Sequence, residues 1–301
     1  MSADANITAA KRIGWIGTGV MGRSMAGHLQ SAGHRLFVFN RTREKADALL
    51  AKGATWCESP AEVAAQCEIL FTIVGYPTDV RETYLGKSGV LAGAGPVLKL
   101  AVDMTTSEPA LAREIAQAAA PQIQVLDAPV SGGDAGAREA RLAIMVGGDA
   151  SAFAQCRPFF EIMGQTIAHM GPAGAGQDTK LANQILVAGN MIGACEALLY
   201  AQRAGLDAQA VIDVIGKGAA ASWTINHLGP RMLQGDFAAG FYVEHFIKDM
   251  DLALNECDRL HLELPGLRLV RRLYQQLVEF GHGRSGTQAL LLALEKMNGT
   301  P

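Results

Sequence analysis

The chain has 301 residues, which is too long for one ordinary hydrophobic core and favours about two domains. Hydrophobic residues make up 49% of the sequence and charged residues 18%, so a sizeable core is expected. The formal net charge of -3 comes from acidic and basic residues interspersed throughout, which argues against nucleic acid or an anionic membrane as the main partner.

The first half of the chain alternates short β-rich runs with helical patterns. The expected strands are residues 12–16, 35–39, 69–74, 97–103, 123–126 and 142–146, and the helical patterns are residues 21–32, 43–52, 60–65 and 108–120. Several strands are continuously apolar, which is typical of strands covered on both faces. The alternation predicts a parallel sheet with right-handed crossovers, which ends near Gly171.

After Gly171 the strand signals almost vanish, and glycine or proline turns separate a series of helical patterns. These patterns cover residues 177–200, 207–217, 223–234, 246–262, 265–280 and 286–297. We therefore expect an α/β domain over residues 1–172 and an all-α domain over residues 173–301, which begins with the long helix that joins the two.

The long helix is apolar on almost every side, as expected of a helix that is buried all round. A membrane span is the competing interpretation. Asn183, Gln184 and Glu196 interrupt the apolar run, and a charged residue at bilayer depth costs about 3 kcal/mol. A soluble core helix is therefore favoured.

A glycine-rich turn follows the first expected strand. It consists of Gly17, Thr18, Gly19, Val20, Met21 and Gly22, a GxGxxG pattern at a strand-to-helix junction. The first two glycines allow a tight turn and close approach of a pyrophosphate, and the helix that follows offers free N–H groups to the phosphates. A glycine turn without a ligand is the alternative. Within a βαβ unit, the pattern predicts a Rossmann-type dinucleotide-binding domain.

The end of the second expected strand distinguishes the two nicotinamide dinucleotides. An acidic side chain there accepts hydrogen bonds from the ribose 2′-OH of NAD, whereas an arginine pairs with the 2′-phosphate of NADP. The chain carries Asn40, Arg41 and Thr42 at this position. We predict NADP as the preferred cofactor, with NAD also accepted; in the competing interpretation Arg41 only solvates a loop.

Lys180 stands near the start of the long helix. With about 3.6 residues per turn, it shares one face of the helix with Asn183 and Gln184. Hydride transfer to an aldehyde leaves an alkoxide-like oxygen that an ammonium protonates, and a neutral amine takes the hydroxyl proton in the reverse direction. Burial on an apolar helix favours the neutral amine. Lys180 is therefore the predicted catalytic residue, and a lysine that snorkels to solvent is the alternative.

The sequence DAPVSGG at residues 127–133 follows the fifth expected strand. Its glycines expose backbone N–H groups and Ser131 adds a hydroxyl, so the segment forms a candidate cradle for a substrate carboxylate. Taken alone, an ordinary turn explains the same residues.

Five motifs together resemble the β-hydroxyacid dehydrogenase family, which includes 3-hydroxyisobutyrate dehydrogenase, tartronate semialdehyde reductase and glyoxylate/succinic semialdehyde reductase. They are GTGVMG at 17–22, DMTTS at 103–107, DAPVSGG at 127–133, GAGQDTKLANQ at 174–184 and FYVEHFIKDMDLA at 241–253. The resemblance spans nearly the whole chain. It implies a Rossmann-type domain, an all-helical C-terminal domain and an NAD(P)-dependent oxidoreductase that interconverts a small β-hydroxyacid and its semialdehyde.

The resemblance also implies roles for single residues. Lys180 would be the general acid/base, and the substrate would be bound by Ser131, Gly132, Gly133, Asn183, Gln184, Phe241 and Asp249. The cofactor would be bound by Gly17, Thr18, Gly19, Val20, Met21, Gly22, Asn40, Arg41, Thr42, Val74, Thr106 and Lys248. Thr106 would touch the nicotinamide side, and Lys248 with Asp249 would close over the cofactor or substrate.

Two positions depart from the family's pattern. Many members carry Asn-Asn where this chain has Asn183-Gln184, which leaves activity in place but alters the expected range of substrates. Ala140 and Arg141 replace an expected glycine-bearing turn, and the role of Arg141 stays open. The sequence does not identify the particular hydroxyacid, since one methylene of pocket depth separates candidates by only about 1–3 kcal/mol.

Three other functions stay as alternatives. A cofactor-binding interaction protein without catalysis can lose the lysine, which this chain keeps at Lys180. An imine reductase shares the architecture and typically has Asp or Tyr in place of that lysine. A phosphogluconate-type decarboxylating enzyme would have a considerably longer chain.

The expected partners are a small carboxylate-bearing substrate and copies of the same chain. Apolar stretches such as residues 289–294 would be exposed in a monomer, so a homodimer or homotetramer is expected. The five cysteines form no CxxC pair and the seven histidines no HxxxH or HxH spacing, so no disulfide framework or metal site is expected. The N-terminal residues MSADANITAAKR lack the apolar stretch of an export signal, which makes the cytoplasm the expected location.

Overall fold

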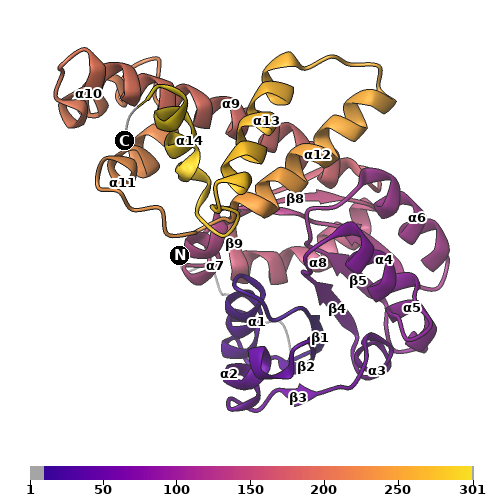
Figure 1. Ribbon diagram of the computed structural model, residues 1–301. Helices are drawn as coiled ribbons and strands as arrows, with labels where there is room; N and C mark the ends of the chain where they lie inside the picture. Colours follow the sequence, from indigo (N-terminus) through magenta and orange to yellow (C-terminus); the bar gives the residue numbers. More distant parts are fainter. Residues whose placement is uncertain (1–9, 300–301) are drawn as a thin grey trace, which may run out of the picture. The chain divides into compact units, whose positions relative to one another are not determined.

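The computed structural model describes residues 10–299, which form two compact units (Figure 1). The first unit ends at Lys180 and the second begins at Leu181. The expected α/β class of the N-terminal half and all-helical class of the C-terminal half are confirmed. The expected domain boundary after residue 172 lies just before the long helix, whereas the division between the compact units lies inside it.

Within the described part of the first unit, a nine-stranded sheet forms the centre. Its strands are β1 (Arg12–Ile16), β2 (Arg35–Phe39), β3 (Thr55–Trp56), β4 (Ile69–Thr72), β5 (Leu100–Asp103), β6 (Gln124–Asp127), β7 (Val130–Ser131), β8 (Leu142–Gly147) and β9 (Gly164–Gly171). Six parallel strands follow the order β3-β2-β1-β4-β5-β6. This is the strand order of dinucleotide-binding folds, in which the ligand crevice lies outside the carboxyl ends of the strands, where the order reverses.

Helices cover both faces of this sheet. They are α1 (Gly22–Ser31), α2 (Asp47–Leu50) after the 3-10 turn η1 (Arg43–Ala46), α3 (Pro60–Gln66), α4 (Pro77–Leu85), α5 (Val90–Gly93), α6 (Pro109–Ala119), α7 (Gly133–Arg138) and α8 (Ala150–Met163). Neighbouring residues of β4 point to opposite sides, so Phe71 packs in a core with α1 and α8, and Leu70 packs in a core with α3, α4 and α6. The prediction of strands covered on both faces is confirmed.

The sheet is mainly parallel, as predicted, but it has antiparallel pairs at one edge. β8 runs antiparallel to β6 and β7, and β9 runs parallel to β8. Only residues 132–141 join β7 to β8, which is too short for the crossover that a parallel pair needs. The sequence patterns also missed β3 and β7, which have two residues each, and β9, whose residues are mostly exposed. Helices α4, α5, α7 and α8 were not predicted either.

The long helix α9 (Ala175–Arg203) begins in the first unit and continues into the second. The prediction that it is buried all round was wrong. Leu186 is 65% exposed and Tyr200 is 73% exposed, and Gly189 and Gly193 are exposed as well. These residues are three, four and seven positions apart, so they follow one side of the helix. Its other side carries buried residues of the second unit's core.

By length and composition, α9 is the one helix among the described residues that is long and apolar enough to cross a membrane. A core helix of a soluble protein passes the same test, so the finding is weak evidence for a membrane span. The buried side chains of α9 in the second unit pack with those of α12 (Val243–Arg259) and α13 (Pro265–Glu279), as expected of a core helix.

The rest of the second unit consists of helices around one core. Besides α12 and α13, these are α10 (Ala208–Ile215), the π-helical turn η2 (Thr224–Leu228), α11 (Gly229–Leu233), the 3-10 turn η3 (Thr287–Ala289) and α14 (Leu290–Met297). The helix predicted at residues 223–234 is therefore η2 followed by α11. The expectation that residues 289–294 lie exposed in a monomer was wrong. Ala289 and Leu290 are 0% exposed and Leu294 is 6% exposed, because they pack into the unit's own core.

Candidate active site

The glycine-rich turn at residues 17–22 joins β1 to α1 and lies against the loop that follows β4. Gly17 has a φ of 96°, and a Cβ there would lie 2.0 Å from the carbonyl oxygen of Ile73. A Cβ on Gly22 would lie 2.0 Å from the carbonyl oxygen of Gly17. A Cβ on Gly19, in contrast, would meet none of the described atoms within 4 Å. The fold therefore requires the first and third glycines, and the second leaves open space beside the turn.

This difference predicts opposite effects for two alanine substitutions. Gly22→Ala should lower the free energy of unfolding by about 1–3 kcal/mol, because its methyl group collides with backbone. Gly19→Ala should leave stability unchanged and weaken NADPH binding, because its methyl group enters the space that a pyrophosphate would use. Thermal unfolding and NADPH fluorescence titration of both variants measure these effects. Normal NADPH affinity in Gly19→Ala would contradict a dinucleotide at this turn.

The turn fits the pyrophosphate of a dinucleotide. In the described chain, α1 begins without a side-chain cap and has no acidic residue in its first turn. The positive end of its dipole and its first N–H groups are therefore available to an anion. The hydroxyl of Thr18 is buried and has no hydrogen-bond partner among the described residues. A ligand with acceptor oxygens would satisfy it.

Asn40 and Arg41 have different positions relative to the turn. Asn40 Oδ1 accepts the N–H of Thr18 over 2.9 Å, and its Nδ2 donates to the carbonyl of Thr42 over 2.7 Å. Asn40 thus ties the second strand to the glycine-rich turn. The Arg41 side chain is 88% exposed, and its Nη1 lies 3.3 Å from Asp79 Oδ1. Exposed pairs of this kind contribute about 0–1 kcal/mol, so the guanidinium is readily available to a phosphate.

The loops that follow β4 and β5 are bonded to each other at the carboxyl edge of the sheet. The Val74 N–H donates to the Thr105 hydroxyl over 3.0 Å, and the Thr105 N–H donates to Asp103 Oδ1 over 3.1 Å. The hydroxyl of Thr72 donates to the same Asp103 oxygen over 2.9 Å. Val74 and the half-buried Thr106 therefore lie beside a fixed hydrogen-bonded junction.

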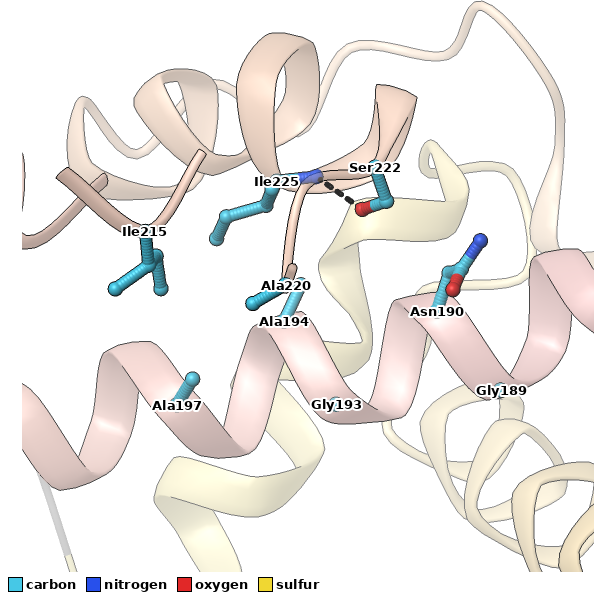
Figure 2. A pocket seen from close by; sticks show the side chains of 9 residues that line it. All are labelled: Gly189, Asn190, Gly193, Ala194, Ala197, Ile215, Ala220, Ser222 and Ile225. Atoms are coloured by element: carbon cyan, nitrogen blue, oxygen red, sulfur yellow. Dashed lines mark hydrogen bonds between the residues drawn. The ribbon is translucent and has the colours of Figure 1, made fainter. Parts of the chain in front are cut away.

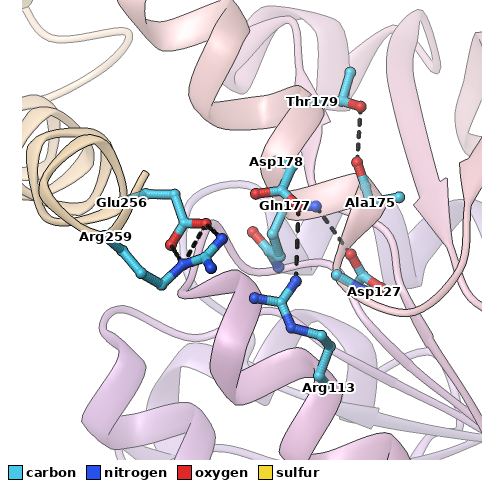
Figure 3. A network of polar contacts seen from close by, with 9 residues as sticks. Arg113, Asp127, Ala175, Gln177, Asp178, Thr179, Glu256 and Arg259 are labelled. Atoms are coloured by element: carbon cyan, nitrogen blue, oxygen red, sulfur yellow. Dashed lines mark hydrogen bonds and ion pairs between the residues drawn. The ribbon is translucent and has the colours of Figure 1, made fainter. Parts of the chain in front are cut away.

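Two buried carboxyls, Asp103 and Asp127, are register partners at the ends of β5 and β6. Burial raises the pKa of Asp103 to about 6 and the pKa of Asp127 to about 6. Asp127 accepts the N–H of Gln177 over 2.9 Å (Figure 3) and the N–H of Gly174 over 2.7 Å. Both bonds oppose the rise of its pKa. Asp127 therefore caps the start of α9 from a neighbouring strand.

The predicted carboxylate cradle spans the end of β7 and the start of α7. Gly132 has a φ of 133° and Gly133 a φ of 62°, conformations that residues with a Cβ rarely adopt. Ser131 is half-buried, and Gly132 is exposed. Glycine thus fixes the shape of a loop that a small molecule can reach.

The turn before β8 places Arg141 in solvent. Ala140 has a φ of 52°, a left-handed conformation that glycine adopts without strain, which explains why a glycine is expected there. The Arg141 side chain is 54% exposed, and its Nε donates to Glu139 Oε2 over 2.7 Å.

Lys180 lies in the second turn of α9 and is 6% exposed. The interpretation of a lysine that snorkels to solvent is therefore wrong. Gln177 lies one turn earlier on the same helix and is 0% exposed. A buried amine needs compensating contacts. The catalytic role of Lys180 stays a prediction.

In the second unit, four of the predicted residues form a chain of contacts. Asn183 Nδ2 donates to Gln184 Oε1 over 2.7 Å, and Gln184 Nε2 donates to Asp249 Oδ2 over 2.6 Å. Lys248 Nζ lies 3.0 Å from Asp249 Oδ1. Gln184 and Asp249 are each 2% exposed, whereas Asn183 is half-buried. The orienting role of Gln184 stays a prediction, and its burial favours an indirect role through Asn183.

Phe241 precedes α12 and packs at the edge of the second unit's core. Its ring is half-buried and its centroid lies 5.6 Å from that of Phe246. Its carbonyl accepts the N–H of Thr287 over 3.1 Å. These contacts fix the residue in its own unit, and its role in lining a substrate pocket stays a prediction.

Residues 10–299 contain no candidate metal site and no disulfide bond. No group of three or more His, Cys, Asp or Glu side chains in that range is arranged to hold a metal. The five cysteines are all buried and unbridged.

Sequence patterns missed the roles of Asp127 and Gln177. Asp127 was recognised only as part of DAPVSGG, although a carboxylate directly after a strand is well placed to cap a helix. Gln177 stands three residues before Lys180, so helical spacing places the two on nearby faces. Neither signal shows which distant backbone groups the side chain reaches.

The strand order and the glycine turn define the first unit as a nicotinamide-dinucleotide-binding domain. Residues 12–171 match the family described as the NAD binding domain of 6-phosphogluconate dehydrogenase. Residues 174–294 match a second family, which is described as NAD-binding of NADP-dependent 3-hydroxyisobutyrate dehydrogenase. The chain belongs to the β-hydroxyacid dehydrogenase family, which confirms the resemblance.

Individual relatives agree with this assignment. A probable mitochondrial 3-hydroxyisobutyrate dehydrogenase-like protein of Arabidopsis thaliana is 52% identical, over 99% of this chain and 89% of its own. The 2-hydroxy-3-oxopropionate reductase of Escherichia coli is 38% identical, over 95% of this chain and 98% of its own. The structure of Mycobacterium tuberculosis 3-hydroxyisobutyrate dehydrogenase with L-serine matches with a TM-score of 0.86 and 31% identity. The match covers 95% of this chain and 99% of that one. An imine reductase from a Pseudomonas species is 18% identical with a TM-score of 0.61, a likeness of fold alone.

Proposed function

We propose that this protein is an NADPH-preferring oxidoreductase that interconverts a small β-hydroxyacid and its semialdehyde, with Lys180 as the general acid/base. The observation that carries the proposal is the buried position of Lys180 on a helix whose first turn is fastened to the sheet edge beside the dinucleotide turn. Membership of the β-hydroxyacid dehydrogenase family supports it.

The amine of Lys180 handles the proton in both directions. The bound nicotinamide supplies or accepts the hydride. As the carbonyl carbon gains the hydride, the ammonium protonates the developing alkoxide and stabilises its charge. In the oxidative direction, the neutral amine accepts the hydroxyl proton. The low exposure of Lys180 keeps water away, which strengthens these interactions.

The carboxylate end of the substrate is assigned to the loop at Ser131, Gly132 and Gly133. The serine hydroxyl and the backbone N–H groups donate hydrogen bonds to a carboxylate, and the loop is accessible. Asn183, held by Gln184, would orient the substrate from the helix. Two relatives are named for 3-hydroxyisobutyrate and 2-hydroxy-3-oxopropionate, which are small molecules of this class.

The cofactor preference is assigned to Arg41, and its replacement is the test. Arg41→Ala should raise the KM for NADPH by about 10- to 100-fold, because a charge-assisted bond to the 2′-phosphate contributes about 1.5–3 kcal/mol. The KM for NADH should change little. Asp79→Asn, which removes the carboxylate beside Arg41, should lower the KM for NADPH a few-fold. Equal losses for both cofactors in Arg41→Ala would contradict the assignment.

The test of the function is the initial rate of NADPH oxidation, with NADH in parallel, against a panel of short aldehyde acids. The panel contains glyoxylate, succinic semialdehyde, tartronate semialdehyde and methylmalonate semialdehyde. Turnover with at least one of them establishes the reductase and its substrate class. Binding of NADPH without any turnover would favour the alternative of a catalytically silent interaction protein.

A second copy of this chain is the proposed partner. In the described part of the second unit, four large apolar side chains are more than 60% exposed, namely Leu186, Tyr200, Val214 and Trp223 at 65%, 73%, 73% and 63%. A pocket of about 240 Å³ opens between α9 and the segment from Ile215 to Ile225, next to Gly189 and Gly193 (Figure 2). Monomers rarely expose such large apolar surface, so a dimer or tetramer is expected by light scattering. A monomeric mass would contradict it.

The cytoplasm is the proposed location. The fold is that of soluble dehydrogenases, and the five cysteines are unbridged, as in a reducing compartment. The plant relative carries "mitochondrial" in its name, so localisation of a tagged chain by microscopy or fractionation is the appropriate measurement.

A further inference from the structure

The side chain of Gln177 holds the loop that contains Thr106 from both sides. Its Nε2 donates to the carbonyl of Thr105 over 2.7 Å, and its Oε1 accepts the N–H of Ser107 over 2.9 Å. Gln177 is 0% exposed, and Ser107 is 1% exposed. One amide group therefore fixes the backbone immediately before and immediately after Thr106.

The main chain of Gln177 is fixed independently of its side chain. Its N–H donates to Asp127 Oδ2 over 2.9 Å, as Figure 3 shows at the first turn of α9. The carboxylate is closely packed, because a Cβ on Gly147 would lie 2.5 Å from Asp127 Oδ1 and a Cβ on Gly176 would lie 2.9 Å from Asp127 Oδ2. The loops that follow β5 and β6 thus both fasten to the first turn of α9.

At the start of α9, the Asp127 carboxylate and the Gln177 side-chain amide have different roles. A helix N-terminus needs acceptors for its first N–H groups, and Asp127 supplies them to Gly174 and Gln177. The amide of Gln177 satisfies none of these N–H groups. Among the residues that the structure describes, the amide bonds only to the loop around Thr106. The side chain therefore serves the placement of that loop.

We propose that Gln177 is a positioning residue that fixes the distance between Thr106, on the nicotinamide side, and Lys180, one helical turn after Gln177. The inference rests on the proposed function, because it concerns the alignment of the hydride donor with the acid/base. Misalignment of about 1 Å at reacting groups lowers rates by about 100-fold. The proposed pyrophosphate and 2′-phosphate contacts are at the glycine-rich turn and Arg41 rather than at Thr106, so we expect the clamp to affect cofactor affinity only slightly.

Gln177→Ala should lower kcat by about 10- to 100-fold and leave the KM for NADPH within about threefold of wild type. A merely structural role would lower cofactor binding and the folded fraction together. Gln30→Ala is the matched control, since Gln30 also donates from Nε2 to two backbone carbonyls in the first unit, those of Leu49 and Lys52. Its kcat should equal that of wild type.

Gln177→Glu supplies a second readout that loss of folding would not produce. The introduced carboxyl, when protonated, can donate to the Thr105 carbonyl and accept from the Ser107 N–H, as the amide does. When ionised, it repels the carbonyl oxygen. Burial favours the protonated form. The ratio of its kcat to that of wild type should therefore exceed the Gln177→Ala ratio at pH 6, where the protonated form is most populated.

If the wild-type protein turns over a substrate, either of two outcomes would contradict the inference about Gln177 and leave the proposed function intact. One is a kcat of Gln177→Ala within threefold of wild type. The other is equal losses of kcat in the Ala and Glu variants at pH 6. A wild type that binds NADPH but reduces no aldehyde acid overturns the proposed function, and the inference falls with it.

Discussion

Lys180→Met is expected to lower kcat by about 10²- to 10⁴-fold, the range that a positioned general acid/base contributes. Methionine has a similar length and suits a residue that is 6% exposed, so the fold should persist. NADPH should bind as in wild type, because the glycine turn and Arg41 are untouched. Steady-state rates with the best substrate of the panel, together with NADPH titration, measure both effects.

The control for this variant is Lys99→Met. Lys99 is an exposed lysine of the same unit, just before β5, and its replacement should leave kcat unchanged. In Lys180→Met the pH dependence of the residual rate should also flatten, since the titrating base is gone. A residual rate within tenfold of wild type would show that another group moves the proton.

Asp103→Asn is expected to raise the free energy of unfolding at pH 7 to 8 by roughly 3 kcal/mol. The pKa of Asp103 is raised by burial from 3.8 to about 6, so the folded state binds more protons than the unfolded state between those values. Stability therefore falls as pH rises from about 4 to about 6 and stays lower above it. Asparagine keeps the oxygen that Thr72 and Thr105 bond, without the buried charge.

Urea unfolding at pH 4, 6 and 8 tests this expectation. Wild type and Asp103→Asn should agree at pH 4 and diverge above it. Glu114→Gln is the control of opposite sign, because the Arg81 guanidinium lowers the pKa of this exposed carboxyl. Its replacement should give no gain at pH 8. A wild-type stability that is constant from pH 4 to 8 would contradict a buried, charged Asp103.

Much of the fold could be predicted from local patterns in the sequence. Strands β1 and β2 agree with their predicted bounds because both are short apolar runs between clear turns. The edge of the sheet could not be predicted in this way. β9 has the sequence GQTIAHMG, and most of its residues are exposed, so no hydrophobic period marks it. Its place depends on pairing with β8, which is a tertiary contact.

In the candidate site too, some residues could be predicted from local sequence, whereas others depend on tertiary contacts. Gly17 and Gly22 could be identified from spacing alone, because the glycine positions of a strand-to-helix phosphate turn have a fixed pattern in the sequence. Arg141 could not be placed, since the local sequence does not say whether a charged side chain meets solvent or a pocket. The link from Asp127 to Gln177 joins residues 50 positions apart and depends on the packing of β6 against the start of α9.

The five unbridged cysteines can serve as internal probes of unfolding. Burial raises the pKa of Cys57 to about 11 and of Cys67 to about 12, and raises that of Cys156 well above its usual range. Thiolates, which react with alkylating reagents, are therefore scarce in the native protein. These three thiols belong to the first unit, whereas Cys195 and Cys257 belong to the second. The order in which a mass spectrometer finds them labelled in rising denaturant would reveal which half of the molecule opens first.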